Sequence, residues 1–423
     1  MNRYDKSDEI IKKGKRYLFE VTRFAEPVIV RGEGSIVWDA DGNKYYDLNA
    51  GQFCMSFGHA YKPFIECVYK QLQKIYHTNT STLSPEVFIA AEKMASITDY
   101  QLTKTLFLST GSEANEAALR YAKFITGKEG VLGFDFGYHG LTLAAQGVTM
   151  GGKWSRPFVP QNISVKTPDY MHSNSECDEQ TFIDECILDL EEKFAIYGNS
   201  LAAVLLEPVI GVGGMISISK KYLMRVRELC DEYNVILIFD ECQCGFARSG
   251  KWFAYQKVEV IPDILVTAKS MGMGFAVSAI TLKENLAICA EGKLVHFSSH
   301  QNDPLSAAVV SFVIDTIKNN NLLKRNERMG EYLLSQLKEA CDITYTLCNA
   351  RGNGLMVAFD INESIVSNYH DYSLRFIKNM ERNGVLIQAI RQGRTFRIMP
   401  NYFVKEEEII DLKKAIIQSV KEI

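Results

Sequence analysis

The sequence predicts an α/β protein. A large domain with a mostly parallel sheet covered by helices is expected beside a smaller α+β domain formed from the two ends of the chain. Three observations support this: short apolar runs between turn residues over 27–49, apolar runs alternating with amphipathic stretches from about 60 to 300, and long helical stretches after 304. The chain has 423 residues, more than one ordinary hydrophobic core contains, so two domains are expected.

The N-terminal segment 27–49 predicts an antiparallel meander. Its sequence, PVIVRGEGSIVWDADGNKYYDLN, places Gly-Glu-Gly and Asp-Gly between short apolar runs, and such turn residues connect neighbouring antiparallel strands. We expect this meander to complete the smaller domain, to which residues 1–58 are therefore assigned.

Residues 59–303 are assigned to the large domain because strand-like and helical patterns alternate there. The apolar runs lie at 105–109, 130–134, 201–207, 235–240, 263–267 and 277–281. Between the third and fourth runs, one helical face would carry Tyr222, Leu223, Val226, Leu229 and Cys230. This succession predicts parallel strands covered by helices, with functional residues at the carboxyl ends of the strands.

Residues 304–423 are assigned to the smaller domain. Helical stretches are expected at 304–320 and 326–341, a strand at 354–361 and a terminal helix at 406–420. No internal repeat, proline-rich linker or low-complexity tract interrupts this order.

The composition argues against several classes of protein. Hydrophobic residues make up 47% and charged residues 23% of the chain, as in ordinary globular proteins. The net charge of −4 argues against non-specific binding of nucleic acid, which relies on a basic face. No apolar run approaches the ~18 residues of a membrane span, and the charged start, MNRYDKSDEIIKKGKRY, lacks the apolar stretch of a secretory signal.

The ten cysteines are scattered singly, apart from Cys242 and Cys244, whose spacing is too short for a CxxC motif. Without a secretory signal, this pattern favours free thiols over a metal site or a disulfide framework. We therefore expect a cytoplasmic protein without a bound metal.

Residues 108–127, LSTGSEANEAALRYAKFITG, predict a strand followed directly by a helix. The backbone N–H groups of Gly111 and Ser112 would lie at the N-terminus of that helix, where the helix dipole and a hydroxyl favour a phosphate. The alternative is that Ser112 only caps the helix.

Two further segments place reactive groups at the ends of apolar strands. Asp240 and Glu241 follow 235–239, where a carboxylate can point into a cleft, although acids at strand ends are common. Lys269 follows 263–267, and a lysine in a cleft can act as an amine nucleophile toward a carbonyl group. It could equally be a surface lysine that extends its amine to solvent. The Gly-Met-Gly after it is too short for a dinucleotide fingerprint.

Together the three segments supply a phosphate cradle, an acid for a ring nitrogen and a lysine for a Schiff base, which are the groups that pyridoxal 5′-phosphate (PLP) requires. The chain resembles the class III aminotransferases of the fold type I PLP-dependent enzymes over nearly its whole length. The resemblance is carried by TGSEANEAALR, FGYHG, LLEPVIGVGG, FDECQCGFARSG, AKSMGMG, HQNDPLSAA, ARGNGLM and FRIMP.

The resemblance implies a role for each catalytic residue. Lys269 would hold PLP as a Schiff base and, once released, move a proton between the substrate α-carbon and the cofactor. Asp240 would pair with the ring nitrogen, and Tyr138 would stack on the ring. Gln243 would lie near the phenolic oxygen.

Other cofactor contacts also follow from the resemblance. Gly111 and Ser112 would hold the phosphate, and His139 and Glu207 belong to the motifs that surround PLP. Ser299 resembles the phosphate ligand that a neighbouring subunit donates. The resemblance thus implies a homodimer with shared active sites, or a tetramer built from such dimers.

The resemblance also bears on the substrate. Arg397 matches the arginine that binds the substrate carboxylate, a task suited to a planar bidentate donor. Arg391 and Arg394 lie nearby and could equally be solvated loop charges. Many ω-amine enzymes of the family carry an acid in the EPxxGxxG segment that neutralises this arginine, and Val212 occupies that position here. An available Arg397 favours α-amino acids over plain ω-amines.

Several segments resemble the dialkylglycine decarboxylase branch most closely: 47–59, HQNDPLSAA and FRIMPNYFVKEEEI. Gln52 matches the glutamine that binds the departing carboxylate there, although it could instead cap a turn. Tyr138 stands where the branch has tryptophan, Val212 where it has serine, Ala276 where it has proline, and Asn401-Tyr402 where it has Pro-Leu.

Three functions are consistent with these residues. The first is transamination from a carboxylate-bearing amino donor to a 2-oxo acid such as pyruvate or 2-oxoglutarate. The second is decarboxylation-dependent transamination or another PLP reaction, such as epimerisation or elimination. The third is a PLP-binding protein without turnover, which the presence of both Lys269 and Asp240 disfavours.

Overall fold

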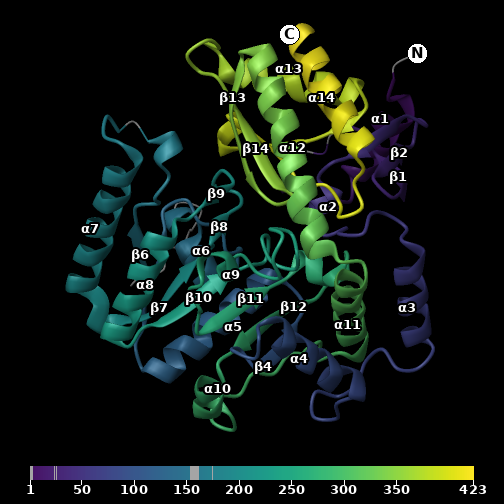
Figure 1. The fold of residues 1–423 in the computed structure, drawn as a ribbon. Helices are drawn as coiled ribbons and strands as arrows, with labels where there is room; N and C mark the ends of the chain where they lie inside the picture. The colour runs from purple at the N-terminus through teal and green to yellow at the C-terminus, as the bar shows by residue number, and fades with distance from the viewer. Residues whose placement is uncertain (1–2, 23, 25, 153–161, 174) are drawn as a thin grey trace.

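The computed structural model describes residues 3–22, 24, 26–152, 162–173 and 175–423 (Figure 1). Its larger part is built on a seven-stranded sheet. In spatial order the strands are β4 (Lys104–Leu108), β12 (Ser278–Leu282), β11 (Ile264–Thr267), β10 (Ile236–Asp240), β7 (Leu201–Leu206), β5 (Gly130–Phe134) and β6 (Asn162–Val165). Only β12 runs antiparallel to its neighbours β4 and β11, so the prediction of a mostly parallel sheet is confirmed.

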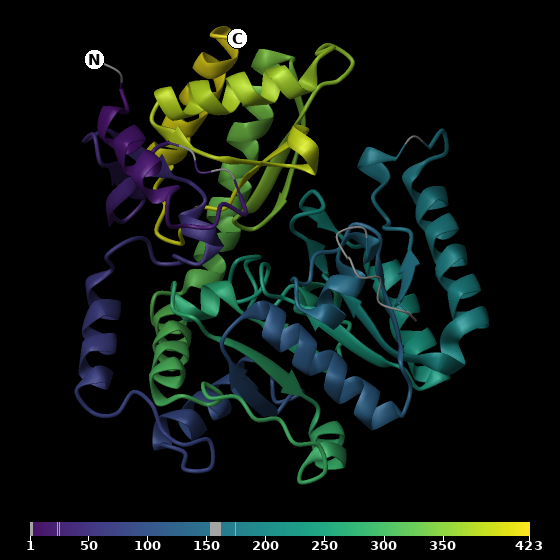
Figure 2. The ribbon, with the colours of Figure 1, turned by 180° about the vertical axis from the view of Figure 1, so that it is seen from behind.

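Helices cover both faces of this sheet. All residues of β7, β10 and β11 are buried, as their continuous apolar runs require. Ile236 and Ile238 pack on the face covered by α5 (Gly111–Thr126), whereas Leu237 and Phe239 pack on the opposite face. Figure 2 shows α5 lying across its face of the sheet.

The opposite face is covered by α8 (Lys220–Tyr233), beside which α7 (Glu179–Tyr197) packs. The five residues expected on one helical face between β7 and β10 are all buried in α8, so that prediction is confirmed. α4 (Pro85–Ile97) packs on β4 at the sheet edge.

The smaller part joins the two ends of the chain, which lie together at the top of Figure 1. The predicted meander forms as β1 (Ile29–Glu33), β2 (Ile36–Asp39) and β3 (Lys44–Asp47). β15 (Val385–Leu386) adds to β3 in parallel, which ties the C-terminal region to the meander.

A second sheet of the smaller part is antiparallel throughout. Its strands in order are β13 (Leu347–Asn353), β14 (Met356–Ile361), β17 (Thr395–Ile398) and β16 (Gln388–Ile390). It is accompanied by α12 (Leu322–Thr344), α13 (Tyr369–Arg382) and α14 (Glu406–Lys421). The expected α+β character is therefore confirmed.

α11 (Pro304–Asn319) packs against α3 (Lys62–Leu72) and α4 below the smaller part. The remaining elements are short, apart from the N-terminal helix: α1 (Asp5–Gly14), α2 (Ala50–Phe53), α6 (Leu143–Val148), β8 (Val209–Ile210), β9 (Ile216–Ser217), α9 (Tyr255–Val258), α10 (Glu284–Ala290), and the 3₁₀ turns η1 (Thr149–Gly152), η2 (Tyr170–His172), η3 (Gly198–Ser200), η4 (Lys269–Gly272) and η5 (Arg391–Gly393).

Across the described ranges, no helix has the length and apolar character needed to cross a membrane. All ten cysteines are free thiols.

Candidate active site

One cavity of about 430 Å³ opens at the carboxyl ends of β4, β5, β7, β10 and β11. Nine of the eleven residues singled out from the sequence line it: Gln52, Gly111, Ser112, Tyr138, His139, Glu207, Asp240, Gln243 and Lys269. The other two, Ser299 and Arg397, are not among its lining residues. Several further lining residues were given no role from the sequence, and they include Cys54, Asn115, Cys242, Phe275 and Val277.

Lys269 begins the turn η4, two residues after β11 ends. Its φ of 48° lies in the left-handed region, which costs a non-glycine residue on the order of 1–2 kcal/mol. The side chain lines the cavity, so the alternative of a surface lysine is wrong. Among the residues that the structure describes, Lys269 is the one lysine that lines the cavity.

Asp240 is the last residue of β10, and its carboxylate accepts three hydrogen bonds. The donors are Asn115 Nδ2 at 2.8 Å, His139 Nδ1 at 2.9 Å and the backbone N–H of Cys242 at 3.0 Å. Burial alone would raise the pKa of Asp240, but the hydrogen bond and charge of His139 and the contacts with Cys242 outweigh burial and lower it. The carboxylate therefore stays ionised inside the protein and can hold a cationic ring nitrogen.

Asn115 lies one helical turn after Gly111 on α5, so both face the cavity. Its Nδ2 also donates to the His139 carbonyl oxygen at 2.9 Å, and it thereby joins the helix to the segment that carries His139. An asparagine four residues after Gly111 was the available sequence signal for this residue.

The first turn of α5 is shaped to accept an anion. Thr110 caps the helix, because its hydroxyl accepts from the Glu113 N–H at 3.2 Å. The alternative that Ser112 is the cap is therefore wrong. A β-carbon on Gly111 would lie 3.0 Å from Cys242 Sγ. Glycine therefore leaves room for an anion to approach the backbone amides at this end of α5.

Glu207 fixes the loops around Tyr138. Its carboxylate accepts from the Tyr138 N–H at 2.9 Å and from the Gly211 N–H at 3.1 Å. Burial raises the pKa of Glu207 to about 7. Gln243 packs closely on Gly211, and its buried Oε1 has no hydrogen-bond partner among the described residues.

Arg397 on β17 is 5% exposed, and its guanidinium lies 4.1 Å from the centre of the Phe53 ring. Nη2 donates to Gln388 Oε1 at 2.7 Å, whereas the buried Nε and Nη1 have no partner in the described ranges. Burial lowers the pKa of Arg397 to about 10, although the charge of Glu207 opposes this shift. The group remains a cation with open donors, as an anion-binding arginine requires.

Gln52 lines the cavity from α2, beside Phe53. Its Oε1 accepts from Gln388 Nε2 at 3.3 Å, so this contact joins its side chain to β16 rather than to its own turn. The turn itself is held by Asp47, which accepts from the N–H groups of Asn49 and Gly51 at 3.1 and 2.7 Å.

Ser299 is exposed and lies in a loop held against the first turn of α5. The Ser298 hydroxyl donates to Glu113 Oε1 at 3.2 Å, and His300 Nδ1 lies 2.8 Å from the Asp303 carboxylate. The loop therefore presents Ser299 outward rather than into the cavity of its own chain.

Arg391 is not a solvated loop charge. Its Nη1 donates to Asp169 Oδ2 at 3.1 Å and to the Gly213 carbonyl oxygen at 2.7 Å, and its side chain is 15% exposed. Arg394 is more exposed and pairs with Glu363 at 3.0 Å. Neither residue lines the cavity.

His172 connects the larger and smaller parts of the protein, and it shares its partner Asp169 with Arg391. Nδ1 lies 2.8 Å from Asp169, and Nε2 lies 3.0 Å from Asp360 of β14. Arg351 pairs with both carboxylate oxygens of Asp360 at 2.8 and 3.0 Å. Burial alone would lower the pKa of His172, but its hydrogen bonds to the two carboxylates outweigh burial and raise it.

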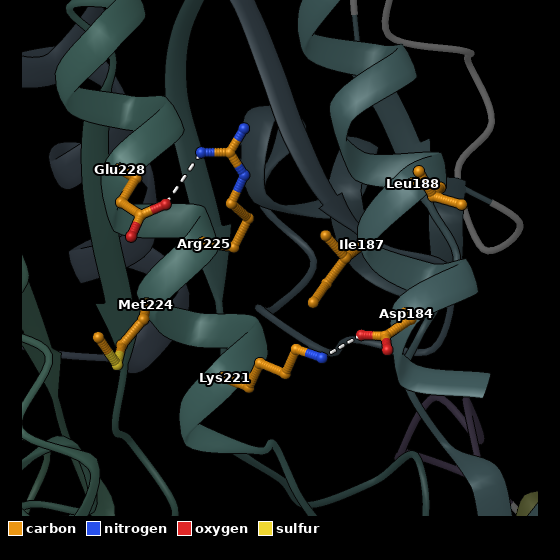
Figure 3. A pocket seen from close by; sticks show the side chains of 7 residues that line it. All are labelled: Asp184, Ile187, Leu188, Lys221, Met224, Arg225 and Glu228. Carbon is orange, nitrogen blue, oxygen red and sulfur yellow. Dashed lines mark hydrogen bonds and ion pairs between the residues drawn. The ribbon is translucent and has the colours of Figure 1, made fainter. Parts of the chain in front are cut away.

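A second hollow, of about 460 Å³, lies between α7 and α8 far from this chemistry (Figure 3). Ile187, Leu188 and Met224 line it, and ion pairs between Lys221 and Asp184 and between Arg225 and Glu228 cross or border it. Its charged side chains form ion pairs with one another, and none of the eleven residues singled out from the sequence lines it.

The groups that line the cavity match those that PLP requires. The first amides of α5 suit a phosphate, ionised Asp240 suits a pyridinium nitrogen, and the Lys269 amine suits an aldehyde. Gln243 Oε1 and His139 Nε2 are buried without partners among the described residues and remain able to contact a ligand. The fold and this site define a PLP-dependent enzyme of fold type I.

Comparison with known proteins gives the family. The model of the class III aminotransferases matches residues 20–420, and the chain belongs to this family. It is 31% identical to an acetylornithine aminotransferase of Archaeoglobus fulgidus, over 94% of this chain and 97% of the relative. It is 32% identical to an uncharacterized aminotransferase of Schizosaccharomyces pombe, over 91% of this chain and 88% of the relative.

Solved structures agree with this assignment. An amine transaminase of an uncultivated Pseudomonas species, in its PLP-bound form, is 26% identical with a TM-score of 0.88, covering 96% of this chain and 98% of that one. An aminotransferase of Bacillus anthracis is 25% identical with a TM-score of 0.91, and 99% of each chain is covered. The protein is thus a PLP-dependent aminotransferase, and the predictions of the family, the fold type, the cofactor and transamination are confirmed.

Proposed function

We propose that the amino donor carries a carboxylate that binds Arg397, and that a 2-oxo acid such as pyruvate or 2-oxoglutarate accepts the amino group. The observation that carries this proposal is the buried Arg397 guanidinium, whose Nε and Nη1 have no partner among the described residues. A buried cation with open donors is costly unless an anion binds it. Val212 stands where an acid would neutralise the arginine, so this arginine stays available for substrate.

When bound, PLP supplies a positively charged ring that withdraws electrons from the substrate α-carbon. We assign the proton transfer to Lys269 Nζ, since within the described part of the chain this is the one lysine amine that lines the cavity. Asp240 keeps the proton on the ring nitrogen, because three donors hold its carboxylate ionised. Gly111 and Ser112 bind the phosphate through the first amides of α5, and Tyr138 lies where an aromatic ring can stack.

A second candidate is decarboxylation-dependent transamination. It is favoured by Gln52, which lines the cavity as a polar group distinct from Arg397. A carboxylate could be held by either of these two groups, and its position would decide which bond to the substrate α-carbon is broken when PLP is bound. Transamination remains the first candidate because Tyr138 and Val212 depart from the decarboxylase pattern.

The proposal extends to assembly, location and domain limits. Exposed Ser299, held beside α5 but outside its own cavity, supports a homodimer in which it reaches the phosphate of the partner site, and a tetramer could be built from such dimers. Phe275 lines the cavity yet is 40% exposed, and Phe297 is 73% exposed, as expected of surfaces that a partner covers. We also propose the cytoplasm as its location, and 1–58, 59–303 and 304–423 as the division of the chain.

The amino donor is tested with the PLP-loaded enzyme alone. L-alanine and L-glutamate, which carry a carboxylate, should discharge the visible absorbance of the bound cofactor, and pyruvate or 2-oxoglutarate should restore it. Propylamine, which lacks a carboxylate, should react far more slowly. Equal reaction of the plain amine and the amino acids would contradict the role of Arg397.

A further inference from the structure

Gln388 and Arg397 are opposite residues on neighbouring strands. In the antiparallel pair of β16 with β17, Gln388 lies directly across from Arg397, so their side chains share one face of the sheet. Arg397 Nη2 is 2.7 Å from Gln388 Oε1, and Gln388 Nε2 is 3.3 Å from Gln52 Oε1. Three polar side chains, from β16, β17 and α2, thus form a series of hydrogen bonds that ends at the cavity.

Arg397 sets the donor-to-acceptor direction of these hydrogen bonds, because a guanidinium has only donors. The atom of Gln388 that faces Arg397 must therefore be its carbonyl oxygen, and the NH₂ group of Gln388 must face Gln52. Gln52 must in turn accept through its own oxygen, which leaves its NH₂ group as the polar atom available to the cavity. This direction does not depend on how the oxygen and nitrogen atoms of the two side-chain amides are initially assigned, because Arg397 can only donate.

The backbone around Gln52 supports a fixed orientation. Ala50, Gly51 and Phe53 all have positive φ values, of 46°, 66° and 65°. Asp47 holds this turn through the Gly51 N–H at 2.7 Å and is itself held by His59 Nε2 at 2.7 Å. The rotation of the Gln52 amide is thus controlled by Gln388 on a backbone that is already held in place.

We propose that Gln388 is a positioning residue. Because it accepts from Arg397 and donates to Gln52, it leaves the NH₂ group of Gln52 facing the cavity, so that the substrate meets hydrogen-bond donors at both Arg397 and Gln52. The substrate class is an amino donor whose carboxylate is bound by these donors, in preference to an amine without an acceptor group. This inference rests on the proposed function and deepens it, because it names the residue that sets the polarity of the pocket.

Two substitutions separate the positioning role from a merely structural one. Gln388→Met keeps a similar length but makes neither hydrogen bond, so the Gln52 amide can rotate. Gln388→Glu keeps the shape but offers only acceptors: one oxygen pairs with Arg397, and the other requires the NH₂ group of Gln52 to turn away from the cavity. Gln392→Met is the matched control, because Gln392 is an exposed glutamine that accepts from Arg394 at 3.4 Å and does not line the cavity.

The first measurement is the dissociation constant of glutarate, an unreactive dicarboxylate, for each PLP-loaded protein by calorimetry. Gln388→Met should weaken binding about 10-fold and Gln388→Glu about 100-fold, since each lost hydrogen bond to a charged group is worth this order of affinity. Gln392→Met should bind as the wild type does. For L-glutamate turnover, KM should rise in the same order, while kcat changes less. With propylamine as the donor, neither Gln388 variant should show a higher KM than the wild type.

A double variant tests the relay itself. In Gln52→Met, the part of the Gln388→Met effect that acts through Gln52 is already lost, so Gln52→Met/Gln388→Met should bind glutarate more tightly than the product of the two single effects predicts. Strictly multiplicative effects, unchanged glutarate binding in Gln388→Met, or an equal loss for glutarate and propylamine would overturn the inference. A wild-type enzyme that neither binds glutarate nor reacts with α-amino acids would instead contradict the proposed function. If Gln388→Glu fails to fold, Gln388→Met and the double variant decide the question.

Discussion

The Nδ1 atom of His139 lies 2.9 Å from Asp240 Oδ2, and both side chains are buried. Asn115 donates to the same carboxylate oxygen at 2.8 Å. The two donors stabilise the ionised form of Asp240 in a place where burial alone would raise its pKa. The structure thus prepares an anion at the end of β10 for the ring nitrogen of PLP.

Asp240→Asn should fold but lose turnover on the order of 10²–10³-fold, because a neutral amide does not stabilise charge on the ring nitrogen. The neighbouring Glu241→Gln is the matched control. Glu241 accepts from the N–H groups of Ala254 and Tyr255 and does not line the cavity. The Glu241→Gln variant should have a lower melting temperature than the wild type but the same activity per folded molecule. Steady-state rates within a few fold of wild type for Asp240→Asn would assign the ring nitrogen to another residue.

His172→Gln should remove a pH-dependent part of the stability. Because the pKa of His172 is raised in the folded protein, its contribution is complete below the ordinary value of about 6.5 and is lost as pH rises through the folded pKa. Replacement should cost about 2 kcal/mol at pH 6 and less at higher pH, which urea unfolding at several pH values measures. The exposed His370→Gln is the control. A loss in the free energy of unfolding that does not change with pH would show that the stabilisation does not come from a charged His172.

The Ser299 assignment is tested by mixing two inactive variants, Lys269→Ala and Ser299→Phe. If Ser299 completes the partner site, exchange of subunits should restore about a quarter of wild-type activity, because half of the dimers are mixed and each has one intact site of two. Mixing two separate Lys269→Ala preparations should restore none. Absence of recovery after verified exchange would place Ser299 outside the active site.

The course of the reaction is tested with 2-aminoisobutyrate, which has no α-hydrogen and can react only with loss of carbon dioxide. We expect rapid amino transfer from L-alanine or L-glutamate and little carbon dioxide from 2-aminoisobutyrate, measured side by side. Rapid release that disappears in Gln52→Ala would instead establish decarboxylation-dependent transamination.

The residues that could be predicted are those with a local signal. Lys269 and Asp240 follow continuous apolar runs, and parallel strands bring their carboxyl ends together whatever the details of the loops. The antiparallel meander was predictable because its turns carry Gly-Glu-Gly and Asp-Gly. Capping of α5 by Ser112 was one of two alternatives from the sequence, and it is wrong because Thr110 occupies the position whose hydroxyl reaches the Glu113 N–H.

Other contacts depend on parts of the chain that are distant in sequence. Asn115 binds Asp240, 125 residues away, and its role follows only when α5 is packed on the sheet. Gln388 and Arg397 meet through the register of β16 and β17, and Gln388 reaches Gln52 across 336 residues. Arg391 resembles a loop charge in the sequence, but it pairs with Asp169 because the two parts of the protein come together there.

The most direct test of the central claim is to reduce the PLP-loaded protein with borohydride and to locate the cofactor by peptide mass spectrometry. We predict that the cofactor is fixed to the peptide that contains Lys269. In Lys269→Ala the visible absorbance and the link should both disappear, and the rate should fall on the order of 10²–10⁴-fold through loss of the general base alone. Exposed Lys293→Ala should behave as the wild type. A cofactor fixed to another lysine, or a link that survives in Lys269→Ala, would contradict the account.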